Sequence, residues 1–141
     1  MSSHLVEVSD YNAAGYSPVV DFQTWRVAIL NYIDELETEL INNFQCHLKT
    51  DEVFVLLEGK CILFCAETSQ GKLGQIVATD MQAGKIYNIK QGVYHTHTLS
   101  QDAKVLIVEN QDTSDNNSPK IAVSADIQQQ LSQLKAQLWG S

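Results

Sequence analysis

Short apolar stretches separated by turn-forming residues run through most of the chain. They are rich in Val, Ile, Leu and Phe, which pack well on a pleated surface and favour β-strands. Their length and their short, regular spacing predict seven or eight strands that close into a β-barrel or jelly roll. The predicted strands include residues 25–32, 53–57, 60–67, 75–81, 85–90, 94–99 and 103–109.

Turn residues indicate how neighbouring stretches connect. Gly59 supplies the positive φ of a tight turn, so residues 53–57 and 60–67 are predicted to form a hairpin around Glu58-Gly59. Residues 68–74 are polar and contain two glycines, which predicts a loop at the barrel rim. Residues 103–109 form the most apolar stretch and should be the central strand of a sheet.

The segments that flank this pattern are less regular. Residues 2–20, with Gly15 and Pro18 as breakers, are predicted to be a loop or an edge strand that wraps the barrel. Residues 33–41 fit a helical face or a solvated connection equally well, because four acids lie among apolar residues at helical spacing. Residues 111–120 are rich in Asp, Asn and Ser and are predicted to be a loop.

From Ser124 onward the apolar residues recur at helical spacing, which predicts a short helix. Ser124 can cap its first turn, Asp126 opposes the helix dipole there, and Gly140 ends it. Its apolar stripe consists of Ile127, Leu131, Leu134 and Leu138. Because a helix this short is unstable alone in water, the stripe must be buried on the outer face of the barrel or on a second subunit.

Residues that can bind a metal interrupt the apolar pattern near the middle of the chain. Gln45 and His47 are two apart in a strand-like stretch, so their side chains share a face. A polar turn at residues 49–51 is predicted to bring the next strand back antiparallel. Glu52 would then point to the side on which His47 lies, giving half of a candidate metal site.

A second histidine-rich stretch lies downstream. His95 and His97 are again two apart, and they share a face if this stretch is a strand. Of the four histidines in the chain, only His4 lies outside the two stretches. The second stretch is therefore the natural source of the remaining ligands.

The first stretch resembles the first sequence motif of the cupin superfamily, a group of small β-barrel proteins. That motif is written G-x5-H-x-H-x3,4-E-x6-G, and Gln45, His47, Glu52 and Gly59 follow its spacing. Two positions differ from it. Gln45 stands where a metal-binding histidine is expected, and Glu39 takes the place of the leading glycine.

The second stretch resembles the second cupin motif, G-x5-P-x-G-x2-H-x3-N. Gly84, Gly92 and His95 follow its spacing, while Lys90 replaces the proline and Leu99 replaces the asparagine. The resemblance covers about half of the chain, residues 40–109. Two motifs in the right order are specific for the fold, but this fold hosts many chemistries, so they do not select a reaction.

The resemblance implies an all-β chain, a single cupin-type β-barrel of the jelly-roll kind with a short C-terminal α-helix. One domain would span residues 1–141, with the barrel core at about 22–111 and the helix at about 124–139. The cupin frame also favours a loop over residues 33–41 that leads into a strand at Leu40.

The resemblance further implies a divalent transition metal ion, Fe, Mn, Ni or Zn, bound by His47, Glu52 and His95. Two imidazoles and one carboxylate suit such ions and leave positions open for water or substrate. Gln45 can join them as a metal ligand through its amide oxygen, or it can hydrogen-bond a metal-bound water or a substrate oxygen. His97 can complete the coordination, serve as an acid–base or substrate-binding group one layer deeper, or be a buried histidine bonded to a neighbouring strand.

Four further side chains are candidates for a role in this site. Glu109 can reach the pocket as a partner of a metal-binding histidine, although a surface position is the default for a glutamate. Arg26 and Tyr94 are candidate substrate contacts, again with a surface or core role as the default. Cys46 alternates away from Gln45 and His47, which argues against a thiolate ligand or nucleophile there.

Composition and charge narrow the classes of partner. The chain has 141 residues, 44% of them hydrophobic, which suits one soluble domain with a real core. A formal net charge of −8 argues against nucleic acid and anionic membranes as partners. The sequence shows neither an apolar run of membrane-spanning length nor the pattern of a signal peptide. Three cysteines without CxxC spacing favour free thiols in a reducing cytoplasm.

The sequence keeps two classes of function open. The first is an enzyme that uses the metal on a small, oxygen-rich or carboxylate-bearing molecule, with His97 as the candidate catalytic base. The alternative is a non-catalytic small-molecule-binding or sensor barrel in which the metal is structural or absent. In either case the helix stripe and the habit of the cupins predict a homodimer.

Overall fold

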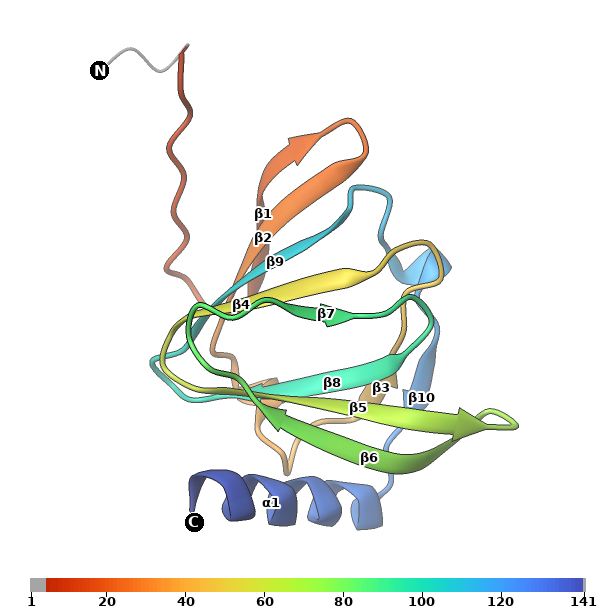
Figure 1. Ribbon diagram of the computed structural model, residues 1–141. Helices are drawn as coiled ribbons and strands as arrows, with labels where there is room; N and C mark the ends of the chain where they lie inside the picture. Colours follow the sequence, from red (N-terminus) through yellow and green to blue (C-terminus); the bar gives the residue numbers. More distant parts are fainter. Residues whose placement is uncertain (1–4, 141) are drawn as a thin grey trace.

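The computed structural model describes residues 5–140, which form two five-stranded antiparallel sheets and one α-helix. The sheets face each other, and the helix lies against the outside of the second sheet (Figure 1). The strand order is β1-β2-β9-β4-β7 in the first sheet and β10-β3-β8-β5-β6 in the second. The predicted all-β fold with a short C-terminal helix is confirmed.

The described residues contain ten strands, one α-helix and two short 3-10 turns. The strands are β1 (Tyr16–Phe22), β2 (Trp25–Asn31), β3 (Asn43–Gln45), β4 (Glu52–Glu58), β5 (Cys61–Ser69), β6 (Lys72–Asp80), β7 (Tyr87–Ile89), β8 (Tyr94–Leu99), β9 (Lys104–Asn110) and β10 (Lys120–Ala122). The helix is α1 (Ala125–Trp139), and short 3-10 turns occupy Asp34–Leu36 and Asp115–Asn117. Within residues 5–140, no helix has both the length and the apolar character needed to cross a membrane.

The apolar core lies between the two sheets because each strand turns alternate side chains inward. The strand β9 is third of five in its sheet and carries Val105 and Ile107 into the core, as predicted for the most apolar stretch. β4 contributes Phe54 and Leu56, and β5 contributes Leu63, all of them almost fully buried. The inner layer therefore holds the two sheets together.

The predicted hairpin around Glu58-Gly59 is wrong. β4 pairs with β7 and β9 in the first sheet, whereas β5 pairs with β6 and β8 in the second. Gly59 does adopt a positive φ of 71°, but the turn carries the chain from one sheet to the other. Residues 49–51 make the same kind of crossing between β3 and β4, so Glu52 faces His47 across the barrel and not from a neighbouring strand.

Several predicted boundaries also need correction. Residues 68–74 are not a rim loop, because β5 and β6 continue as a hairpin to the two-residue turn Gln70-Gly71, in which both residues have positive φ. The strand expected from Leu40 begins only at Asn43. There are ten strands among the described residues, more than predicted, since β1 lies in the segment that the sequence left open and the three-residue β10 begins at the end of a stretch predicted as a loop.

The N-terminal segment combines both alternatives that its sequence left open. Tyr16–Phe22 is an edge strand of the first sheet, while residues 6–12 have no regular structure. Residues 2–4 of that prediction lie outside the described part of the chain. Residues 33–41 form the predicted connection, with one 3-10 turn at Asp34–Leu36.

The C-terminal helix forms as the capping residue and apolar stripe predict. The Ser124 hydroxyl accepts a hydrogen bond from the Ile127 N–H at 3.2 Å. Leu131 is fully buried against Ile62 and Phe64 of β5, on the outer side of the second sheet. Ile127 and Leu134 are partly buried on the same surface, while Leu138 is 42% exposed, so the stripe packs mainly on its own barrel.

Gly59 offers a direct test of the crossing between the sheets. A Cβ atom at this position would lie 2.6 Å from the Ala103 Cα, so Gly59→Ala is expected to lower the free energy of unfolding by about 3 kcal/mol. The left-handed backbone costs about 1–2 kcal/mol and the overlap about 1–3 kcal/mol more.

Gly84→Ala is the matched control for this change. Gly84 has a φ of 84° but no atom within 4 Å of a built Cβ, so only the backbone contribution should be lost. Urea unfolding of both variants measures the difference. Equal losses in the two variants would contradict a close approach between Gly59 and Ala103.

Candidate metal centre

His47, Glu52 and His95 meet inside the barrel, although they are far apart in sequence. His47 follows β3 and His95 lies on β8, both in the second sheet, while Glu52 begins β4 in the first. One ligand atom from each residue lies within 4.8 Å of the others. All three residues are buried, with 9%, 6% and 5% of their surface exposed, respectively. The predicted convergence of two imidazoles and one acid is present in the structure.

Both imidazoles contact the same carboxylate oxygen. The Nε2 atoms of His47 and His95 lie 3.1 and 2.9 Å from Oε1 of Glu52. The two rings are 5.3 Å apart, centre to centre, in an edge-on arrangement. Two ring nitrogens and a carboxylate therefore surround a single point.

The other ring nitrogens are held by fixed partners. His95 Nδ1 lies 3.0 Å from the Val93 carbonyl, which can only accept, so this nitrogen carries the proton. His47 Nδ1 lies 2.8 Å from the Ser118 hydroxyl, which donates its own proton to the Asn117 side-chain oxygen. His47 Nδ1 is then also the donor. Partners of this kind orient metal-binding histidines in proteins.

In a neutral ring these hydrogen bonds leave a lone pair on Nε2 directed at the carboxylate of Glu52, whereas a protonated ring donates a hydrogen bond from Nε2 to that carboxylate. Acceptors that face one another at about 3 Å repel unless a proton or a cation lies between them. A metal ion about 2.0–2.2 Å from each ligand would hold the ligand atoms at roughly the separations seen here. The donor set and its geometry therefore fit a divalent transition metal ion.

The pKa shifts follow from the same contacts. Burial raises the pKa of Glu52, but hydrogen bonds with His47 and His95 outweigh burial and hold that pKa below its ordinary value. Burial lowers the pKa of His47, and the hydrogen bond to Glu52 more than reverses this, so its pKa is raised. The site thus favours a carboxylate at Glu52 together with positive charge beside it.

Gln45 lies beside the cluster. It is paired with His95 across β3 and β8, so the two side chains share the inner face of the second sheet. Its Nε2 donates to the Ser118 carbonyl at 3.2 Å, and the residue lines the same pocket as the three ligands. Both roles considered for its amide oxygen, metal ligand or partner of a bound oxygen, stay predictions.

His97 lies one layer deeper, as its position two residues after His95 predicts. Its ring packs against Phe54 with centroids 5.5 Å apart, and its Nδ1 is buried with no hydrogen-bond partner among residues 5–140. Burial, together with the nearby His95, lowers the pKa of His97 to about 4. One alternative from the sequence was a buried histidine hydrogen-bonded to a neighbouring strand. The Nδ1 of His97 makes no such hydrogen bond among residues 5–140.

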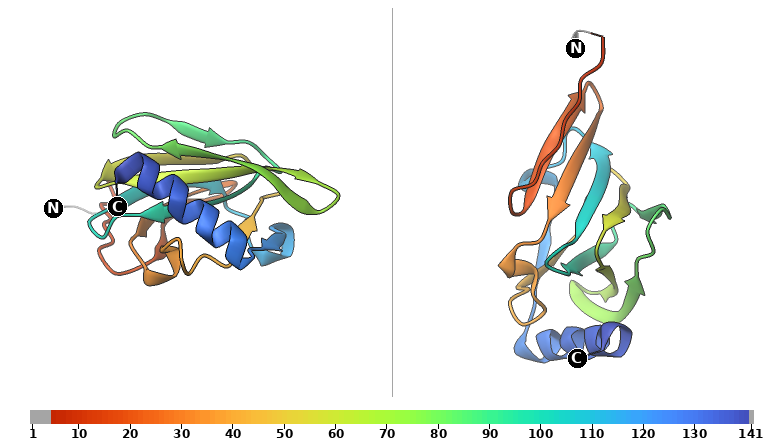
Figure 2. Two further views of the ribbon diagram at one scale, coloured as in Figure 1. Left: turned by 90° about the horizontal axis from the view of Figure 1, so that it is seen from below. Right: turned by 90° about the vertical axis from the view of Figure 1, so that its left-hand side faces the viewer.

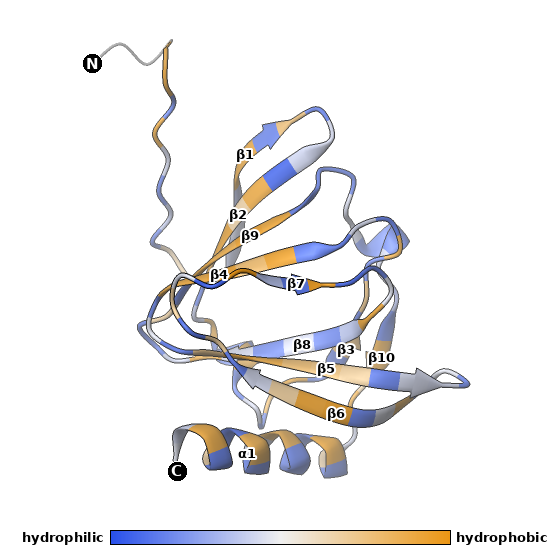
Figure 3. Cartoon of the chain, in the orientation of Figure 1, coloured by the Kyte–Doolittle hydropathy of each residue, from blue (hydrophilic) through white to orange (hydrophobic). Residues whose placement is uncertain are grey.

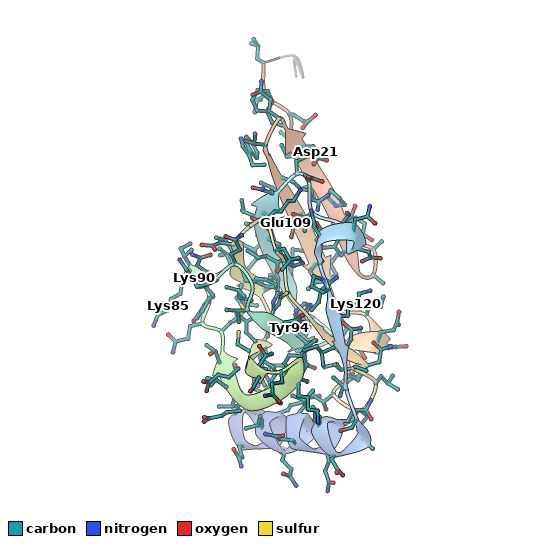
Figure 4. The ribbon with its side chains drawn as sticks, turned by 90° about the vertical axis from the view of Figure 1, so that its right-hand side faces the viewer. Asp21, Lys85, Lys90, Tyr94, Glu109 and Lys120 are labelled. Carbon is teal, nitrogen blue, oxygen red and sulfur yellow. The ribbon has the colours of Figure 1, made fainter. Side chains whose placement is uncertain are left out.

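A second buried carboxylate, Glu109, lies next to the cluster between the two sheets (Figure 4). Its Oε2 accepts a hydrogen bond from the Tyr16 hydroxyl at 2.6 Å. The same oxygen forms an ion pair with Arg26 Nη2 at 2.7 Å. Arg26 also donates to the Thr113 carbonyl at 2.9 Å. Burial and the nearby Glu52 raise the pKa of Glu109, so Arg26 is the charge that keeps this carboxylate inside the barrel.

The remaining candidate side chains lie away from the cluster. Tyr94 packs with the residues beneath α1 and does not line the pocket. Cys46 is buried, and the group of possible metal ligands does not include it. Cys65 pairs with His95 across β5 and β8, and burial raises the pKa of its thiol. None of the three is placed to act as a ligand.

The cluster opens into a pocket of about 520 Å³, a size that suits a small molecule. Arg26 and Glu109 reach it from the first sheet, and the loop that contains Asp115–Asn117 closes one side. Other lining side chains include Tyr16, Glu35, Asn43, Gln45, His97 and Ser114. The pocket therefore offers hydrogen-bond donors and acceptors beside the candidate ligands.

Two residues of this site were not identified from the sequence. Ser118 belongs to a stretch predicted as a solvated loop, and Tyr16 belongs to the irregular N-terminal segment. Ser118 reaches His47 because β10 pairs with β3, and Tyr16 reaches Glu109 because β1 pairs with β2 beside β9. Nothing in the spacing of either residue signals these long-range pairings.

Solved structures with a similar fold exist, although no protein-family model and no curated protein matches the sequence. A variant of Streptomyces Pac13 with uridine is 10% identical over 82% of this chain and 86% of that one, with a TM-score of 0.55. Pac13 is described as a nucleoside dehydratase. BH2720 from Bacillus halodurans is 14% identical over 70% of this chain and 71% of its own, with a TM-score of 0.52.

A third similar structure is a variant of Bacillus subtilis oxalate decarboxylase. It is 14% identical over 70% of this chain and 24% of its own, with a TM-score of 0.51. These likenesses show that the chain has the cupin fold, as its two motifs suggest. At such low identity they show the fold alone.

The ion pair between Arg26 and Glu109 gives a test of the electrostatics. Arg26→Met leaves the buried carboxylate without its counter-charge and is expected to lower the free energy of unfolding by about 3–5 kcal/mol. The double variant Arg26→Met/Glu109→Leu removes both charges and should recover most of this loss. Urea unfolding in the presence of a chelator measures both. A double variant as unstable as the single one would show that the pair is not a buried charge pair.

Proposed function

We propose that this chain binds one divalent transition metal ion through His47, Glu52 and His95 and holds a small, oxygen-rich molecule in the adjoining pocket. The observation that supports this most strongly is the pair of Nε2 atoms that lie 3.1 and 2.9 Å from one buried carboxylate oxygen, while both Nδ1 atoms have partners of their own. Such an arrangement needs positive charge at its centre. Two imidazoles and one carboxylate provide a donor set that Fe, Mn, Ni and Zn all accept.

Three protein ligands leave coordination positions for water or for an oxygen of the bound molecule. When bound, the metal would supply Lewis acidity toward a carbonyl or carboxylate oxygen. We place Gln45 next to these three ligands, because its side chain lies on the same inner face of the sheet as that of His95. Its amide oxygen would either coordinate the ion or hydrogen-bond a bound oxygen.

The chain's own residues shape what the pocket accepts. Arg26 forms an ion pair with Glu109 and donates a hydrogen bond to the Thr113 carbonyl. It therefore neutralises a protein carboxylate, and it also lines the pocket. His97 reaches the pocket without a partner for its Nδ1, and we propose it as the catalytic base if the protein is an enzyme. Its lowered pKa of about 4 keeps this imidazole neutral, so it can accept a proton from a bound hydroxyl or water, as a weaker base than an ordinary histidine.

The class of ligand is supported by pocket size and by the fold neighbours. A volume of about 520 Å³ accommodates a molecule no larger than a nucleoside or a short organic acid. Pac13 is reported with uridine, and the Bacillus subtilis protein is an oxalate decarboxylase. Both molecules are rich in oxygen, which agrees with the polar lining of this pocket.

A non-catalytic binding barrel is the alternative, and one observation favours it. His47, Glu52 and His95 already form a closed hydrogen-bonded group, which protons can stabilise as well as a metal can. In that case the pocket would bind its ligand without turnover, and a chelator would leave binding unchanged. Metal-dependent consumption of a ligand would support the enzyme instead.

A cytoplasmic location is part of the proposal. It is supported by the three cysteines, which are all free thiols in the structure, and two of them are buried. Thiols persist in this form in reducing compartments.

Metal content distinguishes the ligands from their neighbours. Protein purified without chelator is expected to carry about one equivalent of a transition metal, measured by inductively coupled plasma mass spectrometry, and Glu52→Ala and His95→Ala should each lose it. Glu58→Ala is the matched control, because Glu58 ends the same strand as Glu52 but is exposed. Wild-type protein without stoichiometric metal, or ligand variants that retain it, would overturn the assignment.

Metal removal should also change stability. A ligand that binds only the folded protein raises the free energy of unfolding by about 2.7 kcal/mol at a hundredfold excess over its dissociation constant. Thermal unfolding with and without added metal is expected to show this increase in wild type and not in His95→Ala. An equal increase in both proteins would place the metal elsewhere.

A further inference from the structure

The pocket beside the candidate metal centre lies at the polar end of the barrel. Residues 33–43 and residues 111–118 both contribute to its lining, and the two segments lie on the same side of the molecule (Figure 2). The turn Asp115–Asn117 is hydrophilic, whereas β4 and β9 are apolar over most of their length (Figure 3). Hydrogen bonds and charges at this end therefore decide which small molecule the pocket accepts.

Three side-chain oxygens of the pocket have no hydrogen-bond donor among the residues that the structure describes. Both imidazoles contact Oε1 of Glu52, and every donor to Glu109 reaches its Oε2, which leaves the second oxygen of each carboxylate. The amide nitrogen of Gln45 donates to the Ser118 carbonyl, so its Oε1 is left as well. In the described chain the one fully buried side-chain atom without a partner is Nδ1 of His97. The three oxygens therefore keep accessible surface, and their residues all line the pocket.

The donors of the same region are largely used within the chain. Arg26 Nε and Nη2 donate to Glu109 at 3.2 and 2.7 Å, and Nη2 also donates to the Thr113 carbonyl at 2.9 Å. The Tyr16 hydroxyl gives its single proton to Glu109 at 2.6 Å. Of the guanidinium nitrogens, only Nη1 has no acceptor within the described part of the chain. A bound molecule therefore meets more free acceptors than free donors.

The charges of the lining disfavour an acidic ligand. Among the described residues, four acids and one arginine line the pocket: Glu35, Glu52, Glu109, Asp115 and Arg26. Glu109 neutralises Arg26 in a buried pair. Asp115 lies 3.7 Å from Lys120, but both side chains are exposed, so water and salt weaken that pair. A metal ion would compensate Glu52, yet it would leave no free protein cation for the carboxylate of a ligand.

The rest of the wall is largely aliphatic. Its side chains come from β2, from the segment that follows β2, and from β9: Leu30, Ile33, Leu36, Ile41 and Ile107. A wall of this kind accepts the hydrocarbon part of a ligand, while a few polar groups fix its orientation. The pocket therefore suits a molecule with one apolar part and several hydrogen-bonding groups.

Hydroxyl groups match the unpaired atoms of this pocket better than carboxylates do. A hydroxyl donates one hydrogen bond and accepts two, whereas an ionised carboxylate only accepts. It can therefore donate to Gln45 or Glu109 and accept from Nη1 of Arg26. It also suits Nδ1 of His97, whichever ring nitrogen carries the proton. A carboxylate in the same place would set acceptor against acceptor and leave these oxygens unpaired.

We infer that the ligand is an uncharged molecule with several hydroxyl groups and a hydrocarbon part, and that the pocket selects it against the corresponding carboxylic acid. The hydroxyl groups donate to the unpaired oxygens, and the hydrocarbon part packs on the aliphatic wall. This inference rests on the proposed function and narrows its class of ligand, since oxygen-rich molecules include organic acids. It concerns the wall of the pocket, so it does not depend on which metal ion the site binds.

Matched pairs of an alcohol and its acid test the inference on the metal-loaded full chain. Phenyl β-glucoside with phenyl β-glucuronide, and 3-phenylpropane-1,2-diol with 3-phenyllactate, differ only in a CH2OH group against a carboxylate. Isothermal titration calorimetry is expected to give a dissociation constant at least about tenfold lower for the alcohol than for the acid, because like charges repel in the pocket. An acid that binds as tightly as its alcohol would overturn the inference, and so would absence of binding by both alcohols at millimolar concentration.

A variant that frees the arginine should reverse the preference. Glu109→Gln removes one carboxylate from the wall and leaves Arg26 without its partner, so the acid of each pair is expected to bind more tightly than the alcohol. Glu58→Gln is the matched control, because Glu58 is exposed at the far end of β4, and it should keep the preference for the alcohol. A folded Glu109→Gln protein that still prefers the alcohol would contradict the role of Arg26 and Glu109. If this variant does not fold, the wild-type titrations still decide the inference.

The same titrations in the presence of a chelator separate this inference from the proposed function. If the metal site is wrongly assigned, the protein carries no stoichiometric metal, yet the alcohols should still be preferred because the wall of the pocket is unchanged. If the metal content is as proposed and the acids are preferred, this inference alone is wrong. A preference for acids that appears only with metal bound would also overturn it, because the metal and not the wall would then select the ligand.

Discussion

The carboxylate of Glu52 is the interaction on which the interior of this barrel depends. It starts a strand of one sheet and is reached by two imidazoles from the other, so it links the sheets at their polar end. Backbone carbonyl and hydroxyl partners fix the far side of each imidazole, so the near side of a neutral ring has a lone pair to offer. Burial makes this concentration of acceptors costly unless positive charge compensates it. That balance favours positive charge at the point where the three side chains meet.

The same constraint explains the second carboxylate. Glu109 is buried near Glu52, and two uncompensated negative charges so close would oppose folding. Arg26 lies directly opposite Glu109 across β2 and β9 and neutralises it, with help from the Tyr16 hydroxyl. The barrel is thus divided along its strands. One end is filled by Phe54, Leu56 and their neighbours, and the other holds paired charges around a pocket.

The sequence predicted the candidate ligands better than the path of the chain. Motif spacing brought His47, Glu52 and His95 together correctly, because alternation along strands is a local property. It could not assign β4 and β5 to different sheets, since a tight turn with a glycine serves a hairpin and a crossing equally well. Ser118 and Tyr16 were missed because their partners are about seventy and ninety residues away. Only the pairing of short strands brings such residues together.

The contact between Ser118 and His47 has a consequence for how the protein is made. β10 follows Ser118 directly, pairs with β3 beside His47, and is the last strand before α1. A growing polypeptide that has just completed β9 already contains every candidate ligand, yet lacks the hydroxyl that orients one ring. Ser118 must therefore be synthesised, and β10 must pair with β3, before the His47 ring acquires its final orientation in the candidate metal site.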